Sequence, residues 1–167
     1  MIEIVRERSI PASSRRVWDV VSDARRLPDW YARAQRVEVL SGEGLGRHQR
    51  VISQWHGRPS EINQVVTVFQ PERELEWRHE AELLDGQPAP RFSAETLVSI
   101  RLSSEGQEVT HVTLVSRQRP ADAEKEAVMR GNSEQLGLSL EASLERLEAV
   151  VGPADPSASG DRQLDSP

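Results

Sequence analysis

A regular apolar stripe near the C-terminal end of the sequence constrains the fold more than any other feature. Its members are spaced 4, 4, 3 and 4 residues apart, as on one buried face of an α-helix: Leu136, Leu140, Leu144, Leu147 and Val151. We expect one helix over residues 121–151, which would be roughly 45 Å long. Continued backward, the stripe meets Asn132 and Val128 and becomes polar and small. The first half of this helix should therefore face something other than packed core.

Most of the preceding sequence reads as strands. Alternating or β-branched runs between turn residues predict about six to seven antiparallel strands, at residues 2–10, 36–55, 61–69, 74–82, 92–102 and 108–118. Two short helices are expected after the first strand. One begins near Ser13 or Ser14, either of which has a hydroxyl that can cap a helix, and the other is interrupted at Pro28. This order predicts an α+β fold in which a curved antiparallel sheet wraps around the long C-terminal helix and encloses space.

The strand ELEWRHEAE, residues 74–82, indicates which side of the sheet faces outward. Successive side chains of a strand point to opposite faces. One face carries five charges, and unpaired charges are costly to bury, so this face should meet solvent: Glu74, Glu76, Arg78, Glu80 and Glu82. Trp77 and His79 then lie on the concave side. The inward faces of the strands around Trp55 and His111 stay unassigned, because those strands alternate poorly.

Composition and charge narrow the class of protein. The chain has 167 residues and no cysteine, which excludes disulfides, thiolate catalysis and cysteine-ligated metal sites. A net charge of −6 argues against nucleic-acid binding, which needs a basic surface. We see neither a signal-peptide pattern nor an apolar run that could span a membrane, so we expect a cytoplasmic protein with no integral membrane association. Residues 152–167, rich in Pro, Ser and Asp, are expected to be a disordered acidic tail to one domain, residues 1–151.

A long local pattern, together with this order of elements, resembles the START-like or SRPBCC superfamily, the helix-grip proteins. The pattern covers residues 9–44 and includes Ile10, a proline-containing bend, Val17-Trp18, Ser22-Asp23, Pro28 and Trp30. The similarity extends over residues 1–151 and is greatest to the polyketide cyclase/dehydrase-like branch. It implies a helix-grip fold with a deep hydrophobic cavity for a small apolar molecule. The matching residues belong to the scaffold, and such folds host many activities.

His79 is the candidate catalytic residue. Histidine titrates near neutral pH, and a cyclase that promotes an aldol condensation needs a group to move protons next to a carbonyl. The alternative is a histidine that bonds to a neighbouring strand or to water and takes no part in chemistry. In either case we expect His79 to contact the cavity.

Eight further residues are candidates for ligand contact: Trp30, Tyr31, Trp55, Trp77, Val98, Ile100, Val128 and Asn132. The two aromatics of the second short helix, Trp30 and Tyr31, would border the cavity entrance, as the resemblance implies, or Trp30 would pack in the core. Trp55 either lines the cavity mouth or packs a sheet corner, and Asn132 either bonds a ligand from the roof or faces water. No metal or cofactor is expected, because the four histidines show no ligand spacing and SGEGLG reads as a hairpin turn rather than a nucleotide loop.

Three functions are compatible with these features. The first is a polyketide cyclase/aromatase-like enzyme that holds a reactive chain in a folded geometry, assisted by His79 or Asn132. The second is a non-catalytic carrier or sensor of a lipid, a quinone or a similar small hydrophobic ligand. The third is a protein-binding module of the chaperone-activating kind, with a collapsed cavity. The sequence does not specify the oligomeric state.

Overall fold

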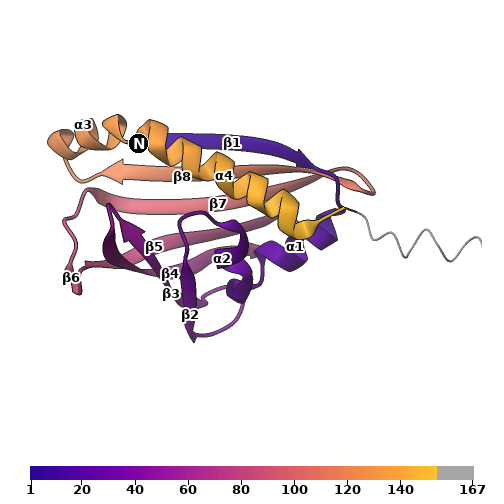
Figure 1. Cartoon of the computed structure of the whole chain (residues 1–167), viewed down its shortest axis with the longest axis horizontal. Helices are drawn as coiled ribbons and strands as arrows, with labels where there is room; N and C mark the ends of the chain where they lie inside the picture. Colours follow the sequence, from indigo (N-terminus) through magenta and orange to yellow (C-terminus); the bar gives the residue numbers. More distant parts are fainter. Residues whose placement is uncertain (154–167) are drawn as a thin grey trace, which may run out of the picture.

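The computed structural model describes residues 1–153, which form one curved antiparallel sheet covered by helices (Figure 1). Within these residues the strands are β1 (Ile2–Ile10), β2 (Arg36–Ser41), β3 (His48–Trp55), β4 (Arg58–Gln70), β5 (Glu74–Leu84), β6 (Gln87–Pro88), β7 (Ser93–Gly106) and β8 (Val109–Pro120). Their order across the sheet is β1-β8-β7-β5-β4-β3-β2, and the short β6 pairs with β5. The predicted α+β helix-grip fold is confirmed. All but the first two residues of the predicted tail lie outside the described residues.

Two short helices follow β1, as predicted. They are α1 (Ser14–Val21) and α2 (Leu27–Trp30), and a short 3-10 turn (Ala24–Arg26) lies between them. The Ser13 hydroxyl oxygen caps α1 by accepting a hydrogen bond from the backbone N–H of Arg16 at 3.3 Å.

The C-terminal helix is divided in two, which corrects the prediction of one long helix. Helix α3 (Ala123–Gly131) ends and α4 (Ser133–Val151) begins at Asn132. A glycine followed by an asparagine has low helix propensity, which gives the break a local cause. Helix α3 buries Met129, whereas Val128 and Asn132 are exposed. The backward extension of the apolar stripe through these two residues was therefore wrong.

Helix α4 crosses the sheet over β1 and β8 and also contacts α2 (Figure 1). Leu140, Leu144 and Leu147 are buried, which confirms that this part of the stripe packs on the sheet. Ser143 of the same helix accepts a hydrogen bond from the backbone N–H of Ala32 at 2.9 Å. This bond ties the segment that follows α2 to the middle of α4.

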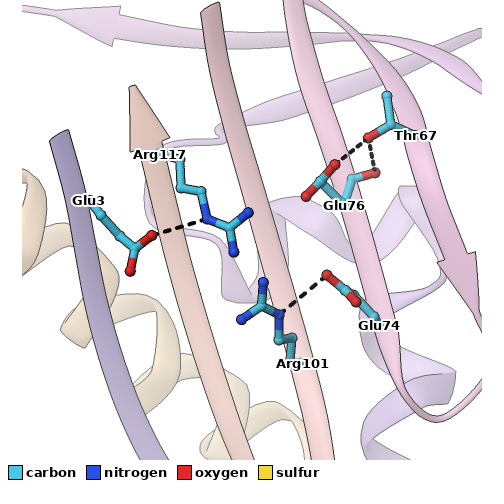
Figure 2. A network of polar contacts seen from close by, with 6 residues as sticks. All are labelled: Glu3, Thr67, Glu74, Glu76, Arg101 and Arg117. Atoms are coloured by element: carbon cyan, nitrogen blue, oxygen red, sulfur yellow. Dashed lines mark hydrogen bonds and ion pairs between the residues drawn. The ribbon is translucent and has the colours of Figure 1, made fainter. Parts of the chain in front are cut away.

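Charged side chains on the outer face of the sheet pair across neighbouring strands (Figure 2). Glu3 of β1 accepts from Arg117 of β8, and Glu74 of β5 accepts from Arg101 of β7. A third contact joins β4 to β5. These contacts place the odd-numbered side chains of β8 outside, which settles the face of the strand that contains His111.

A β-bulge in β5 changes the alternation on which the assignment of faces depended. Gln64 of β4 pairs with His79, and Ile62 pairs with Glu82, so two residues of β5 stand opposite one residue of β4. Such a bulge shifts the phase of the strand by one residue. Trp77, before the bulge, is buried as predicted. Glu82 is exposed, as predicted, but the bulge turns it to the side of His79 and not to that of the other four charges.

Candidate functional site

Three aromatic side chains meet on the concave side of the sheet, one from β5 and two from the C-terminal end of α2. The rings of Trp30 and Tyr31 have centroids 5.6 Å apart, and Tyr31 makes a T-shaped contact with Trp77 at 5.4 Å. Their exposed fractions are only 0%, 4% and 1%, respectively. Edge-to-face contacts of this kind are favourable between aromatic rings. These three residues are called the aromatic cluster below.

Two N–H groups of the aromatic cluster have no hydrogen-bond acceptor among the described residues. The indole N–H groups of Trp30 and Trp77 are buried, and neither has a hydrogen-bond partner within residues 1–153. A buried donor in this state costs about 1–3 kcal/mol. Burial raises the pKa of the Tyr31 phenol, against a smaller opposing effect of Arg33, so the hydroxyl stays neutral and can donate. The cluster therefore suits an apolar molecule that carries hydrogen-bond acceptors.

A row of hydrogen-bonded polar side chains crosses the same face from the start of β3 to β5. The Arg47 Nε–H donates to Gln49 Oε1 at 3.0 Å, and Gln49 Nε2 donates to Gln64 Oε1 at 2.9 Å. Gln64 Nε2 lies 3.5 Å from His79 Nε2. His79 Nδ1 lies 3.3 Å from Glu82 Oε1. These five residues are called the polar chain below.

Most of the polar chain is enclosed. Gln49 and Gln64 are fully buried, and Arg47 is buried with a second hydrogen bond, to the backbone carbonyl of Ser22 at 3.2 Å. Exposure rises at the other end, to 15% for the His79 side chain and 43% for that of Glu82. The polar chain thus leads from a buried cation to a carboxylate near the surface. Buried polar networks whose members are all bonded are rigid.

Sequence reasoning found His79 and missed the other members of the polar chain. The signal for Arg47 and Gln49 was present as poor alternation at the start of β3. Both residues put polar groups at inward positions, where apolar residues are the usual choice. Gln64 carries no comparable signal, because a lone glutamine in a strand is ordinarily a surface residue.

His79 and Glu82 form a histidine–carboxylate pair. The hydrogen bond with His79 lowers the pKa of Glu82, and positive charge on His79 and Arg33 acts in the same direction. Burial opposes these effects but is outweighed. Glu82 is therefore ionised at neutral pH and acts only as an acceptor toward the histidine ring.

Replacement of Glu82 by glutamine is expected to remove an acid-sensitive contribution to stability. Because the folded-state pKa lies below the ordinary value of 4.5, the carboxylate contributes stability above that pH, and this contribution is lost as pH falls through the folded-state pKa. The variant should be less stable than the wild type near neutral pH, by less than about 1 kcal/mol because the side chain is partly exposed.

Urea unfolding of both proteins over a series of pH values measures this difference. We expect the difference to disappear in acid. Glu108→Gln, at an exposed turn, is the matched control for removal of one carboxylate. A stability difference for Glu82→Gln that stays constant across the pH series would contradict the assignment.

The structure brings together five of the nine residues chosen from the sequence in the hydrophobic core: Trp30, Tyr31, Trp77, Val98 and Ile100. His79 lies two residues beyond Trp77 on β5. The other three lie elsewhere. Trp55 is at the tip of the β3–β4 hairpin, 44% exposed and edge-on to His56. Val128 and Asn132 are exposed at the end of α3. Met129, which sequence reasoning did not select, is the residue that α3 turns inward.

A hollow of about 370 Å³ opens near the other end of the polar chain, between the segment after α1 and the β2–β3 turn. Gly44 takes a positive φ of 59° in this turn, which confirms that the glycine-rich segment is a hairpin turn. The charged side chains in the lining are Asp23, Glu43, Arg25 and Arg47. Two acidic and two basic groups balance, so the hollow shows no preference for a charged ligand.

Two further findings concern metal-binding clusters and membrane-spanning helices. Within residues 1–153, no cluster of three or more histidine, aspartate or glutamate side chains is placed to hold a metal ion. No helix of the same part of the chain is both long enough and apolar enough to span a membrane.

Solved structures with a similar fold include proteins of several kinds. The Zhui aromatase/cyclase from Streptomyces sp. R1128 is 16% identical, with a TM-score of 0.69 over 90% of this chain and 93% of that chain. The protein TTHA0849 from Thermus thermophilus is 19% identical, with a TM-score of 0.70 over 95% and 99% of the two chains. A START superfamily protein from Mycobacterium smegmatis is 14% identical, with a TM-score of 0.68 over 89% and 96%. At these identities the similarity shows the fold.

Sequence comparison gives the family. No curated protein matches the sequence. The pattern of the family described as polyketide cyclase / dehydrase and lipid transport matches residues 1–152. Because this match covers nearly all of the chain, the protein belongs to that family.

Proposed function

We propose that this protein binds a small, largely apolar or aromatic molecule that carries hydrogen-bond acceptors, on the concave side of the sheet beside the aromatic cluster. The observation that supports this most directly is the pair of buried indole N–H groups, on Trp30 and Trp77, without acceptors among residues 1–153. A carbonyl oxygen against either group would accept its hydrogen. The neighbouring rings would bury apolar surface of the ligand. Membership of the family supports a ligand-binding or cyclase role.

Two related compounds test this ligand class. Naphthoquinone has two carbonyl acceptors, and naphthalene has the same fused-ring skeleton without acceptors. We expect naphthoquinone to bind more tightly by about 2- to 10-fold, the worth of one typical hydrogen bond. The chain has no cysteine, so the quinone has no thiol to react with. Calorimetric titration measures both affinities.

The Trp77→Phe variant keeps an aromatic ring and removes the N–H. Because Trp30 offers a second N–H, we expect this variant to weaken the preference for naphthoquinone and Trp30→Phe/Trp77→Phe to lose it, while both variants still bind naphthalene. Trp18→Phe is the matched control, because Trp18 is a buried tryptophan of α1 that packs on Phe69 instead. Equal affinities of the wild type for the two compounds, or a preference that Trp30→Phe/Trp77→Phe leaves unchanged, would contradict the proposal.

Cyclase-type chemistry is the activity that His79 would add. Its Nε2 faces Gln64 in the longest contact of the polar chain and can exchange that contact for the ligand. Nε2 would take a proton from a carbon next to a carbonyl, and the enolate would form a carbon–carbon bond to a second carbonyl carbon of the same molecule. The alkoxide produced would take the proton back. Proton transfer of this kind contributes about 10²–10⁴-fold, and the holding of both ends in place contributes as well.

A second function, carriage or sensing of the same ligand class without chemistry, is favoured by one observation. Both ring nitrogens of His79 already have partners in the protein. Cyclisation of a linear compound with several carbonyl groups separates the two functions. As an enzyme, the protein accelerates ring closure, and His79→Gln lowers the rate by about 10²-fold or more with little change in binding. As a carrier, it binds the compound and leaves the rate of ring closure unchanged.

A further inference from the structure

The hydrogen bonds of the polar chain all run in one direction, because the residue at one end can only donate and the residue at the other end can only accept. The guanidinium of Arg47 has only donors, and the ionised carboxylate of Glu82 has only acceptors. Between them, each glutamine amide and the neutral imidazole has one donor side and one acceptor side and can be turned either way. Only one arrangement of these three groups satisfies both ends.

The arrangement can be followed from the cation. Gln49 presents Oε1 to the Arg47 Nε–H at 3.0 Å, which leaves its NH₂ group for the next residue. Gln64 Oε1 accepts a hydrogen bond from the NH₂ group of Gln49 at 2.9 Å. The NH₂ group of Gln64 therefore faces His79 Nε2 at 3.5 Å. An NH₂ group offers only hydrogens. Nε2 must therefore be the nitrogen without a proton.

The other end gives the same result independently. Glu82 Oε1 lies 3.3 Å from His79 Nδ1, and a carboxylate oxygen can only accept. Nδ1 must therefore carry the proton. Both glutamines are fully buried, so water cannot take the place of either amide. A flip of one amide would put two NH₂ groups, or two oxygens, face to face.

We propose that Arg47 is a positioning residue that holds the neutral His79 ring as its Nδ1–H tautomer, acting through Gln49 and Gln64 without touching the ring. The consequence for chemistry rests on the proposed function, because the tautomer leaves the Nε2 lone pair as the base. The tautomer itself is a property of the protein without ligand. It can therefore be measured whether or not the proposed ligand binds.

Nitrogen NMR of the ligand-free chain tests the proposal, because a protonated ring nitrogen and an unprotonated one have distinct chemical shifts. The spectrum is recorded in alkaline buffer, where histidine rings are neutral, and His79→Gln identifies the signals by their loss. We expect a single Nδ1–H form in the wild type. Because Glu82 also favours Nδ1–H, the role of Arg47 is tested in the Glu82→Gln background, where Arg47 alone should hold the single form. In Arg47→Met/Glu82→Gln, which leaves the amides free to turn, we expect both tautomers in comparable amounts. Arg47→Lys in the same background should restore the single form, since lysine is also only a donor.

A second variant tests the donor-to-acceptor direction of the polar chain and keeps Arg47 in place. In the Glu82→Gln background, Gln64→Glu keeps the acceptor for Gln49 and places an oxygen where the NH₂ group faced His79, so the proton should move from Nδ1 to Nε2. Gln70→Glu, exposed on the same strand, adds the same charge and should leave the wild-type spectrum unchanged. A proton on Nε2 in the wild type would overturn the proposal. So would a single Nδ1–H form in folded Arg47→Met/Glu82→Gln or in Gln64→Glu/Glu82→Gln.

Discussion

Replacement of Trp77 by alanine is expected to lower the free energy of unfolding by about 3–5 kcal/mol. The side chain is 1% exposed and packs against Tyr31 with ring centroids 5.4 Å apart. In the sheet it stands between Val66 of β4 and Val98 of β7. Paired strands on both sides hold the backbone in place, so the cavity left by alanine cannot collapse fully. Urea unfolding followed by circular dichroism measures the loss without dependence on tryptophan fluorescence.

The same substitution at Trp55 is the matched control. Trp55 is 44% exposed at the tip of a hairpin, and its loss should cost about 0.5 kcal/mol or less. The comparison removes effects common to any tryptophan-to-alanine change. If Trp77→Ala were no more destabilising than Trp55→Ala, the central position assigned to Trp77 would be wrong.

Replacement of Gln49 by leucine is expected to cost about 3 kcal/mol, although leucine is apolar and the site is buried. The substitution leaves the Arg47 Nε–H and the Gln64 Oε1 without partners. Each unpaired buried group carries a desolvation penalty, and the penalty is larger for the charged guanidinium. Urea unfolding again gives the free energy. Gln54→Leu, exposed on the same strand, should change stability by no more than about 0.5 kcal/mol.

A triple variant separates lost hydrogen bonds from unsatisfied partners. Arg47→Met, Gln49→Leu and Gln64→Leu together remove the buried cation and both amides, so few buried groups are left unpaired. Replacement of a whole buried polar group by apolar residues of similar size is often close to neutral. We therefore expect the triple variant to be more stable than Gln49→Leu alone. If the triple variant were less stable than Gln49→Leu, the hydrogen bonds of the polar chain would themselves contribute to the free energy of unfolding.

The fold was largely predictable because most of its elements meet the core along one uniform face. The leucines of α4 repeat with the helical period since that helix lies on the sheet along its length. Val98 and Ile100 alternate with polar residues since β7 has one buried face. Periodicity failed at Asn132, where extension of the stripe assumed a continuous helix and the backbone instead ends α3 and starts α4.

The candidate site was predictable in its aromatic half and, within the polar chain, only at His79. A buried tryptophan such as Trp77 is recognised from its own strand, because its size and its charged neighbours identify its face. A buried glutamine is identified only by its partner, and Gln49 and Gln64 belong to different strands. The partnership of His79 with Glu82 depends on register against β4, which a single strand does not specify.

The bulge in β5 also has a consequence for how related sequences should be compared. Glu82 reaches His79 only because two residues, Glu80 and Ala81, occupy the space opposite one residue of β4. If the same residues paired one-to-one with β4, without the bulge, simple alternation would turn the carboxylate away from the ring, whereas loss of one residue at this point would leave it on the side of the ring. Two homologues can thus share every residue type around the histidine and still differ in whether it has an acidic partner. In a comparison of a related sequence with this one, the spacing of histidine and glutamate therefore has to be considered together with the strand register between them.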